Sequence, residues 1–171
     1  MKQLFKTSRL RVREAKETDI DFIMSQESHI DNCSFVFQES YEIHVKQMES
    51  KQLGLWMIEK IKNEAPVGFM LVNIDKDSEV MELRRIAISE KRDGFGEEIM
   101  KGLMAYAFDV IGMNRFWLDV FTDNIRGIAL YKKLGMVYEG TLRESHKDQN
   151  GYRSQMVFSL LKREYLLEKR G

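Results

Sequence analysis

The sequence predicts a single α+β (mixed α/β) domain over residues 1–171, with a mixed, mostly antiparallel twisted sheet of about six to seven strands and about four helices. Three observations predict this class. The chain is 43% hydrophobic and 11% aromatic, which is enough to bury a core. The apolar period switches between the alternation of strands and the spacing of helices. Only one strand–helix–strand crossover interrupts a series of strands joined by short turns, so the sheet is not doubly wound.

The N-terminal part begins with a strand and a helix. Arg9–Glu14 alternates apolar and charged residues, as a half-buried strand does. A helix is expected to follow, with Thr18 as its cap and Asp21, three residues on, as the capping-box acid. Residues 31–53 predict helical turns and loops.

Strands dominate the middle of the chain. Gly54–Lys62 and Pro66–Asp75 are separated by Asn-Glu-Ala, which suits a hairpin, and Glu79–Ile88 follows a turn-like Asp-Lys-Asp-Ser. In Glu97–Gly112 the apolar residues recur at helical spacing, and Gly112 is placed to cap the C-terminus.

The C-terminal part predicts a strand, a helix and a final pair of strands. Asn114–Phe121 is expected to be a strand, and Asn124–Gly135 a helix that begins at a capping residue and ends in two lysines and a glycine. Met136–Arg143 and Tyr152–Leu161 are expected to pair around Asn150-Gly151, a strong turn signal.

Composition excludes several classes. Lys and Arg total 27, as do Asp and Glu, and this balance argues against a dedicated nucleic-acid binder. The single cysteine, Cys33, cannot form an internal disulfide or a thiolate metal cluster, and we expect no metal. We interpret Cys33 as a reduced thiol in a cytoplasmic protein. The weaker alternative is a nucleophilic Cys33 with His29 as its basic partner. No apolar run predicts a signal peptide or a membrane span.

The segment Lys91–Glu98, "KRDGFGEE", places two glycines between a predicted strand and a predicted helix. A dinucleotide-binding turn fits poorly, because Ile99 replaces the third glycine, and a P-loop fails because no Gly-Lys-Ser/Thr follows. Two interpretations stay open: a sharp turn without a ligand, and a cradle for an anion at a helix N-terminus. Glu97 and Glu98 count against the cradle unless their side chains splay away.

Two further segments accompany this loop, "ELRRIAI" (Glu82–Ile88) and "WLDVFTDNIRGIALYKKLGMVYEG" (Trp117–Gly140). Together they resemble the GNAT family of acetyl-CoA-dependent N-acetyltransferases. The family's Q/R-x-x-G-x-G/A loop is similar to Lys91–Gly96, and its N-x-x-A-x-x-x-Y-x-x-x-G-F segment is similar to Asn124–Met136. Lys91, Gly127 and Met136 depart from the usual residues without removing a required chemical group.

The resemblance extends over nearly the whole chain. It is nearest to the branch that holds ribosomal-protein N-terminal acetyltransferases and spermidine N-acetyltransferases, because Tyr138–Tyr165 is similar to their C-terminal segment. The resemblance implies an enzyme with acetyl-CoA as co-substrate. A regulatory module that senses acyl-CoA or a polyamine on the same fold is the alternative.

The resemblance also implies roles for particular residues. Tyr131 matches the tyrosine that protonates the leaving thiolate, and Asn124 matches the asparagine that hydrogen-bonds the cofactor. A glutamate such as Glu82 is the slightly favoured base, directly or through water, and Asp119 is the other candidate. The pantetheine arm would lie along Ile86, Ala87 and Ile88, and the pyrophosphate on Lys91, Arg92, Asp93, Gly94, Phe95 and Gly96.

The alternation of side chains along a strand predicts the face of the sheet on which each candidate base lies. Regular alternation would place Glu82 on one face with Arg84, Ile86 and Ile88, and Asp119 with Trp117 and Phe121. We also expect a bulky residue at Gly94, such as valine, to abolish cofactor binding and to leave the fold largely intact.

The acceptor is left open by the sequence. Candidates are a polyamine, a protein N-terminus, or another small amine such as an antibiotic or amino sugar. Acidic residues between Glu14 and Asp31 could attract a cationic acceptor, although such residues more often form a solvated helix face. A homodimer is possible, because edge strands often pair between subunits.

Overall fold

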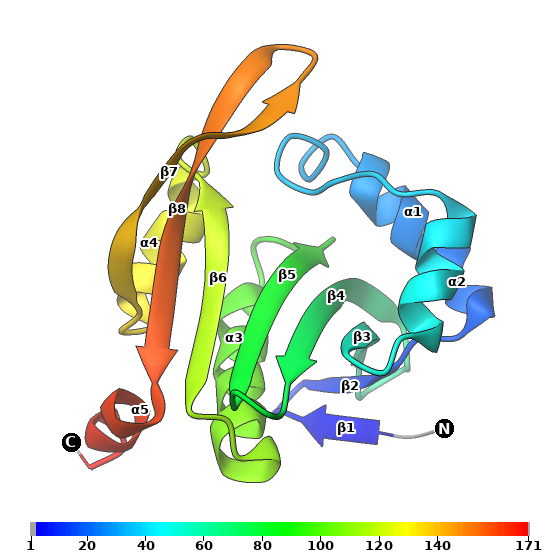
Figure 1. Cartoon of the computed structure of the whole chain (residues 1–171). Helices are drawn as coiled ribbons and strands as arrows, with labels where there is room; N and C mark the ends of the chain where they lie inside the picture. Colours follow the sequence, from blue (N-terminus) through cyan, green and yellow to red (C-terminus); the bar gives the residue numbers. More distant parts are fainter. Residues whose placement is uncertain (1–2, 171) are drawn as a thin grey trace.

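Eight strands form one twisted sheet in the computed structural model, which describes residues 3–170 (Figure 1). Their order is β1-β2-β3-β4-β5-β6-β8-β7, and every neighbouring pair is antiparallel except β5–β6. The strands are β1 (Gln3–Lys6), β2 (Leu10–Glu14), β3 (Leu53–Lys60), β4 (Pro66–Asp75), β5 (Val80–Ile88), β6 (Arg115–Phe121), β7 (Val137–Asp148) and β8 (Gly151–Leu161).

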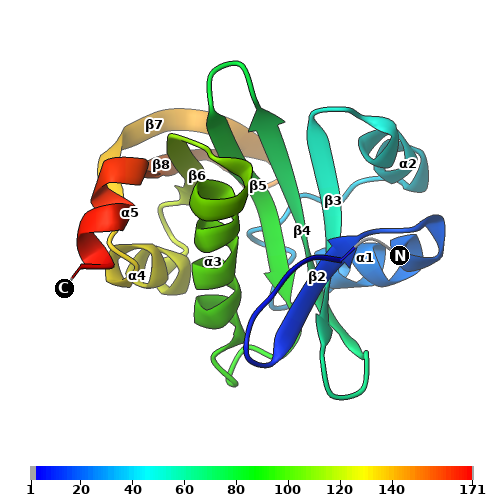
Figure 2. The same ribbon diagram turned by 90° about the horizontal axis from the view of Figure 1, so that it is seen from below.

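Five α-helices cover the two faces of this sheet within the described residues (Figure 2). They are α1 (Ile20–Ser28), α2 (Tyr41–Glu49), α3 (Phe95–Ala105), α4 (Ile125–Lys133) and α5 (Lys162–Glu168). The larger core lies between the sheet and α3, α4 and α5, and the smaller core lies under α1 and α2 on the opposite face. The predicted fold class and element order are confirmed, with slightly more strands and helices than expected.

The two additional elements depend on contacts with distant parts of the chain. β1 has four residues and pairs with β2 at the edge of the sheet. α5 begins at Lys162, and its buried Tyr165 stacks on Phe108 with ring centroids 4.8 Å apart. Neither β1 nor α5 is long enough to show a hydrophobic period in the sequence, so neither was predicted.

The predicted cap of α1 is wrong. Thr18 lies inside a short 3-10 turn, Glu17–Asp19, and the helix begins one residue after it. The carboxylate of Asp19 accepts a hydrogen bond from the backbone nitrogen of Lys16 (2.8 Å) and pairs with Arg13 (2.7 Å), so Asp19 rather than Thr18 stabilises the turn that precedes the helix. By contrast, the predicted cap at Gly112 is present, with a φ of 85° after a π-helical turn over Tyr106–Ile111.

None of the helices in the described part of the chain is long and apolar enough to span a membrane.

Candidate active site

The two halves of the sheet separate between β5 and β6 (Figure 1). The parallel register runs only from Val80↔Arg115 to Leu83↔Leu118, although both strands continue beyond it. The later residues of β5 pair with β4 alone, from Arg85↔Leu71 to Ile88↔Gly68. The backbone groups that face β6 here have no partner strand, so an extended ligand can hydrogen-bond to this edge.

A groove of about 820 Å³ opens at this edge and runs between the loop before α3 and the first turns of α4. Eight of the eleven predicted cofactor contacts line it: Ile86, Ile88, Lys91, Arg92, Gly94, Gly96, Asn124 and Tyr131. Ala87, Asp93 and Phe95 do not. Ala87 is buried in the smaller core, Asp93 is exposed in the turn, and the ring of Phe95 is buried beneath Arg9.

The glycine loop leads directly into α3, which has eleven residues. Gly94 is the N-cap, with a φ of 74°, a conformation that favours glycine. Gly96 lies in the first turn, where the amides have no intrahelical acceptor and carry the positive end of the helix dipole. A methyl group added to Gly96 would meet only Leu130, at 3.8 Å, so the space beside this turn is open to a ligand.

Arg126 is a groove residue that sequence reasoning missed. Its guanidinium donates to the carbonyl oxygen of Lys91 (3.0 Å), so two cations lie together at the rim of the groove. The pKa of Lys91 is lowered, mainly by burial and further by Arg126. A cation in the first turn of α4 opposes the helix dipole. That unfavourable position was the available signal that an anion belongs nearby.

The charges of the two glutamates beside the loop are balanced by other partners, although Glu97 itself lines the groove. Glu98 accepts hydrogen bonds from Thr7, Ser8 and both the backbone and the guanidinium of Arg9, at 2.5–3.0 Å. Glu97 pairs with Lys101 (2.8 Å) and Lys133 (2.5 Å). These partners lower the pKa of each carboxyl to about 2, against the opposing effect of burial at Glu98. Because both carboxylates are paired, the charges of Glu97 and Glu98 no longer argue against an anion-binding loop.

Tyr131 lies where two cavities meet. It lines the groove, and it also lines a smaller adjoining cavity of about 80 Å³. Burial raises the pKa of its phenol to about 12, with a further contribution from Asp119. The hydroxyl therefore keeps its proton at neutral pH and can act as a donor.

The two candidate bases differ in position. Asp119 lines the smaller cavity with Tyr131, and its side chain accepts from Gln155 (3.0 Å). Burial raises the pKa of Asp119, which makes the carboxylate a better proton acceptor. Burial also raises the pKa of Glu82, and Asp119 adds to this rise while Arg84 opposes it. Glu82 does not line the smaller cavity.

The predicted face of Glu82 is wrong because β5 contains a bulge. Leu71 pairs with Arg85, while the next residue, Val72, pairs with Leu83. Arg84 is therefore an extra residue, and the alternation changes parity there. Leu83, Ile86 and Ile88 consequently face the larger core, and Glu82 does not share their face. The alternation predicted for β6 is present, with Phe116, Leu118 and Val120 in the larger core and Asp119 between them.

Asn124 caps α4, because its side-chain oxygen accepts from the backbone nitrogen of Gly127 (3.0 Å). A methyl group on residue 127 would lie 2.9 Å from the Asn124 amide, so glycine in place of the usual alanine lets this cap close tightly. The alternative pair of Cys33 and His29 does not form. The sulfur of Cys33 contacts the Ile30 carbonyl (3.7 Å), and the ring of His29 accepts from the backbone of Asp31 (3.2 Å).

The acidic residues before Asp31 are partly committed to internal partners. Asp19 pairs with Arg13, and Glu27 is buried between Arg85 and His44. These two carboxylates stabilise the fold rather than form an open acidic surface. Among residues 3–170 no group of three or more His, Cys, Asp and Glu side chains could hold a metal ion.

Comparison with known proteins agrees with this geometry. A family model described as "Acetyltransferase (GNAT) family" matches residues 22–136, more than half of the chain. A spermidine N(1)-acetyltransferase of Vibrio cholerae is 22% identical over 167 residues, 93% of this chain and 96% of that protein. A spermine/spermidine N(1)-acetyltransferase of Bacillus subtilis is 25% identical over 127 residues, 72% of this chain and 81% of that protein.

Solved structures share the fold. The spermidine N-acetyltransferase from Vibrio cholerae in complex with CoA and spermine has a TM-score of 0.83 at 21% identity, over 93% of this chain and 99% of that one. A GCN5-related N-acetyltransferase from Brucella melitensis has a TM-score of 0.82 at 19% identity, over 96% of this chain and 80% of that one.

The chain belongs to the acetyltransferase (GNAT) family. The predicted family and the predicted activity, an acetyl-CoA-dependent N-acetyltransferase, are confirmed at this level, and the non-catalytic sensing module is not favoured.

Proposed function

We propose that this protein transfers an acetyl group from acetyl-CoA to the primary amine of a small molecule, with Tyr131 as general acid. One observation carries the proposal: the phenol of Tyr131 lies at the junction of a long groove suited to the cofactor and a small cavity suited to an amine. Polyamines are the first acceptors to examine, because two curated relatives are named for spermidine or spermine.

The residues of the groove fit coenzyme A. The free edge of β5 at Ile86 and Ile88 suits the amide groups of the pantetheine arm. The first-turn amides of α3, with Lys91, Arg92 and Arg126 at the rim, suit the phosphates. The bare backbone at Gly96 leaves the room that a phosphate needs. When bound, the cofactor supplies the activated acetyl group as a thioester.

Side chains of the protein then take part in two proton transfers, one from the amine nitrogen and one to the departing sulfur. Acetyl transfer forms a carbon–nitrogen bond and breaks a carbon–sulfur bond, so nitrogen loses a proton and the departing sulfur gains one. Tyr131, which keeps its proton to about pH 12, is the donor for the sulfur. Asp119, which lines the smaller cavity, is the proposed acceptor of the amine proton, and Glu82, which does not line it, is the alternative base, directly or through water.

Turnover by three variants tests these roles. Thiol release is measured with acetyl-CoA and polyamines, simple amines, N-terminal peptides and aminoglycosides. Tyr131→Phe is expected to lower kcat by about a hundredfold with little change in KM for acetyl-CoA, because only proton transfer is removed. Asp119→Asn should lower kcat by a similar factor, and Glu82→Gln by less. Unchanged kcat in Tyr131→Phe would remove the tyrosine from the mechanism.

A metal-free reaction, a homodimer, a cytoplasmic location and a single domain over residues 1–171 stay predictions. A dodecamer has been described for the spermidine N-acetyltransferase of Vibrio cholerae, so size-exclusion chromatography with light scattering is the measurement that decides the oligomeric state here.

A further inference from the structure

The segment Asn32–Glu39 joins α1 to α2 and crosses between the two separated halves of the sheet; we call it the strap. Asn32 is buried, and its side-chain amide donates to the carbonyl oxygen of Gln26 (2.9 Å), which fixes the start of the strap to α1. The middle of the strap, Phe35–Phe37, contributes three side chains to the smaller cavity. The strap is therefore the roof over the place where Asp119 and Tyr131 meet.

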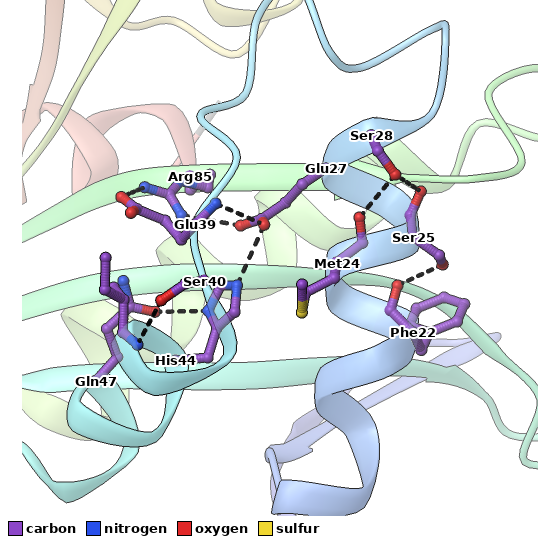
Figure 3. A network of polar contacts seen from close by, with 11 residues as sticks. Phe22, Met24, Ser25, Glu27, Ser28, Glu39, Ser40, His44, Gln47 and Arg85 are labelled. Carbon is purple, nitrogen blue, oxygen red and sulfur yellow. Dashed lines mark hydrogen bonds and ion pairs between the residues drawn. The ribbon is translucent and has the colours of Figure 1, made fainter.

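One side of the strap is anchored to β5 by a buried polar network (Figure 3). The guanidinium of Arg85 donates to Glu27 (3.0 Å) and to Glu39 at the end of the strap (3.1 Å). The backbone nitrogen of Glu39 donates to Glu27 (3.1 Å). Arg85 also lies against the ring of Phe37, 5.7 Å from its centroid. Figure 3 shows Glu27 of α1 reaching between Arg85 and His44, so α1, α2 and β5 hold this end together.

The other side is anchored to β6, β7 and β8 by Arg153. This guanidinium donates to the Ser34 carbonyl (2.6 Å) and to Asp123 (2.8 Å), and it lies over the ring of Phe121 at 3.6 Å. The ring of Phe37 contacts the ring of His146 in the hairpin, at 4.6 Å between centroids. Fixed on both sides of the cleft, the roof cannot rise without breaking charge-assisted hydrogen bonds.

The space beneath the roof is narrow. The cavity measures about 80 Å³, and its apolar walls include Leu83, Leu118 and Val120, opposite the strap. The groove on the far side of Tyr131 is about ten times larger. An acceptor amine that reaches Asp119 and Tyr131 must place the carbon next to its nitrogen between these walls. A second substituent on that carbon would compete with the strap side chains and these walls for the same space.

Resting on the proposed function, we infer that the strap restricts acceptors to amines on an unbranched carbon, with Phe37 as the residue that sets the limit and Arg153 as a positioning residue. Linear alkylamines and polyamine ends meet this condition. Every protein N-terminus other than glycine carries a side chain on that carbon and is excluded.

Matched amines test the restriction in the full-length enzyme. We would compare kcat/KM for 1-aminobutane with 2-aminobutane, and for 1,4-diaminobutane with 2,5-diaminohexane. Each pair differs in branching at the carbon that bears nitrogen. We expect the linear member to be preferred by about tenfold or more, since one misplaced methyl group in a pocket has an effect of that size. A peptide with an N-terminal alanine should not be acetylated.

Variants then attribute the preference to the strap. Phe37→Ala should reduce it to about threefold or less, mainly by raising kcat/KM for the branched amines, with KM for acetyl-CoA unchanged. Arg153→Gln should also relax it, and circular dichroism reports whether either variant remains folded. Tyr152→Ala is the control: this side chain lies next to Arg153 on β8 but is 64% exposed and does not line the cavity, so the preference should persist.

The outcomes separate this inference from the proposed function. Acetylation of branched amines or the alanine peptide as fast as their linear counterparts overturns the restriction while the acetyltransferase stands. A preference that Phe37→Ala leaves unchanged overturns the role of the strap. No turnover of any amine would instead defeat the proposed function, and this inference with it.

Discussion

Gly94 and Gly96 stand two residues apart in one loop, and their missing side chains have different consequences. Gly94 adopts a φ of 74°, so valine there strains the backbone as well as crowding the groove. Gly94→Val is therefore expected to lower stability as well as cofactor binding, so a loss of binding in this variant would not isolate the cofactor contact. Gly96 has ordinary helical geometry within α3 and an open space beside it. Of the two glycines, Gly96 is the one at which a side chain can be added without straining the backbone.

Gly96→Ala should separate binding from stability. Alanine is favoured over glycine in a helix by about 0.5–1 kcal/mol, so the free protein should unfold at a slightly higher temperature. The new methyl group points into the space where a phosphate would approach, so acetyl-CoA should raise the melting temperature less than in the wild type. Thermal unfolding with and without millimolar acetyl-CoA measures both effects. An undiminished cofactor shift would show that the phosphate does not lie against this turn.

Among elements, α3 and the turn between β1 and β2 are joined by one carboxylate. Glu98 of α3 accepts four hydrogen bonds from Thr7, Ser8 and Arg9, while its neighbour Glu97 pairs with two exposed lysines. Both carboxyls have a pKa of about 2. Glu97 joins α3 to α4 through the exposed Lys133 alone, whereas the side chain of Glu98 is only 14% exposed and all four of its hydrogen bonds join α3 to the turn between β1 and β2. Equal pKa values therefore conceal different structural roles.

Replacing each glutamate by glutamine should reveal this difference. Glu98→Gln is expected to lower the free energy of unfolding by about 1–2 kcal/mol, after allowance for the exposure of Arg9. Glu97→Gln serves as the matched control and should have little effect. Urea unfolding at neutral pH measures both. Because the folded-state pKa of Glu98 is depressed, its contribution is present above the ordinary value of 4.5 and disappears as the pH falls towards 2. Equal losses from the two variants would contradict the assignment.

The elements also show what sequence could predict. Long segments with a clear period were predicted well: β4 has the predicted bounds, and the helix predicted over Glu97–Gly112 corresponds to α3 together with the π-helical turn that follows it. The site residues that belong to a motif, Tyr131 and Asn124, line the groove. The bulge at Arg84 carries no local signal, because it is defined only by the register with β4. The strap gains its role from Arg85 and Arg153, which lie far from it in sequence, so no local pattern could identify it.

At the scale of the whole molecule, one buried network joins the N-terminal helices to the sheet. Glu27 and Glu39 bring two negative charges, and Arg85 brings one positive charge. His44, which is fully buried, contacts Glu27 (3.2 Å) with one ring nitrogen and Gln47 (3.0 Å) with the other. The network is electrically balanced only when His44 is protonated. Burial alone would lower the pKa of His44, but Glu27 and Gln47 outweigh burial and raise the pKa above 6.5.

Stability should therefore depend on pH through His44. A raised folded-state pKa means that the stabilisation is fully present below about 6.5, the unfolded value, and is lost as the pH rises through the folded value. The urea concentration at the midpoint of unfolding of the wild type should therefore decrease as the pH is raised from about 6.5 through the folded-state pKa of His44. His44→Asn should flatten this decline, because asparagine cannot carry the charge. His29→Asn, which alters a half-exposed ring outside the network, should keep the decline. If His44→Asn retains the full pH dependence, the histidine in the network is neutral, and the charge of Glu27 is balanced by Arg85 alone.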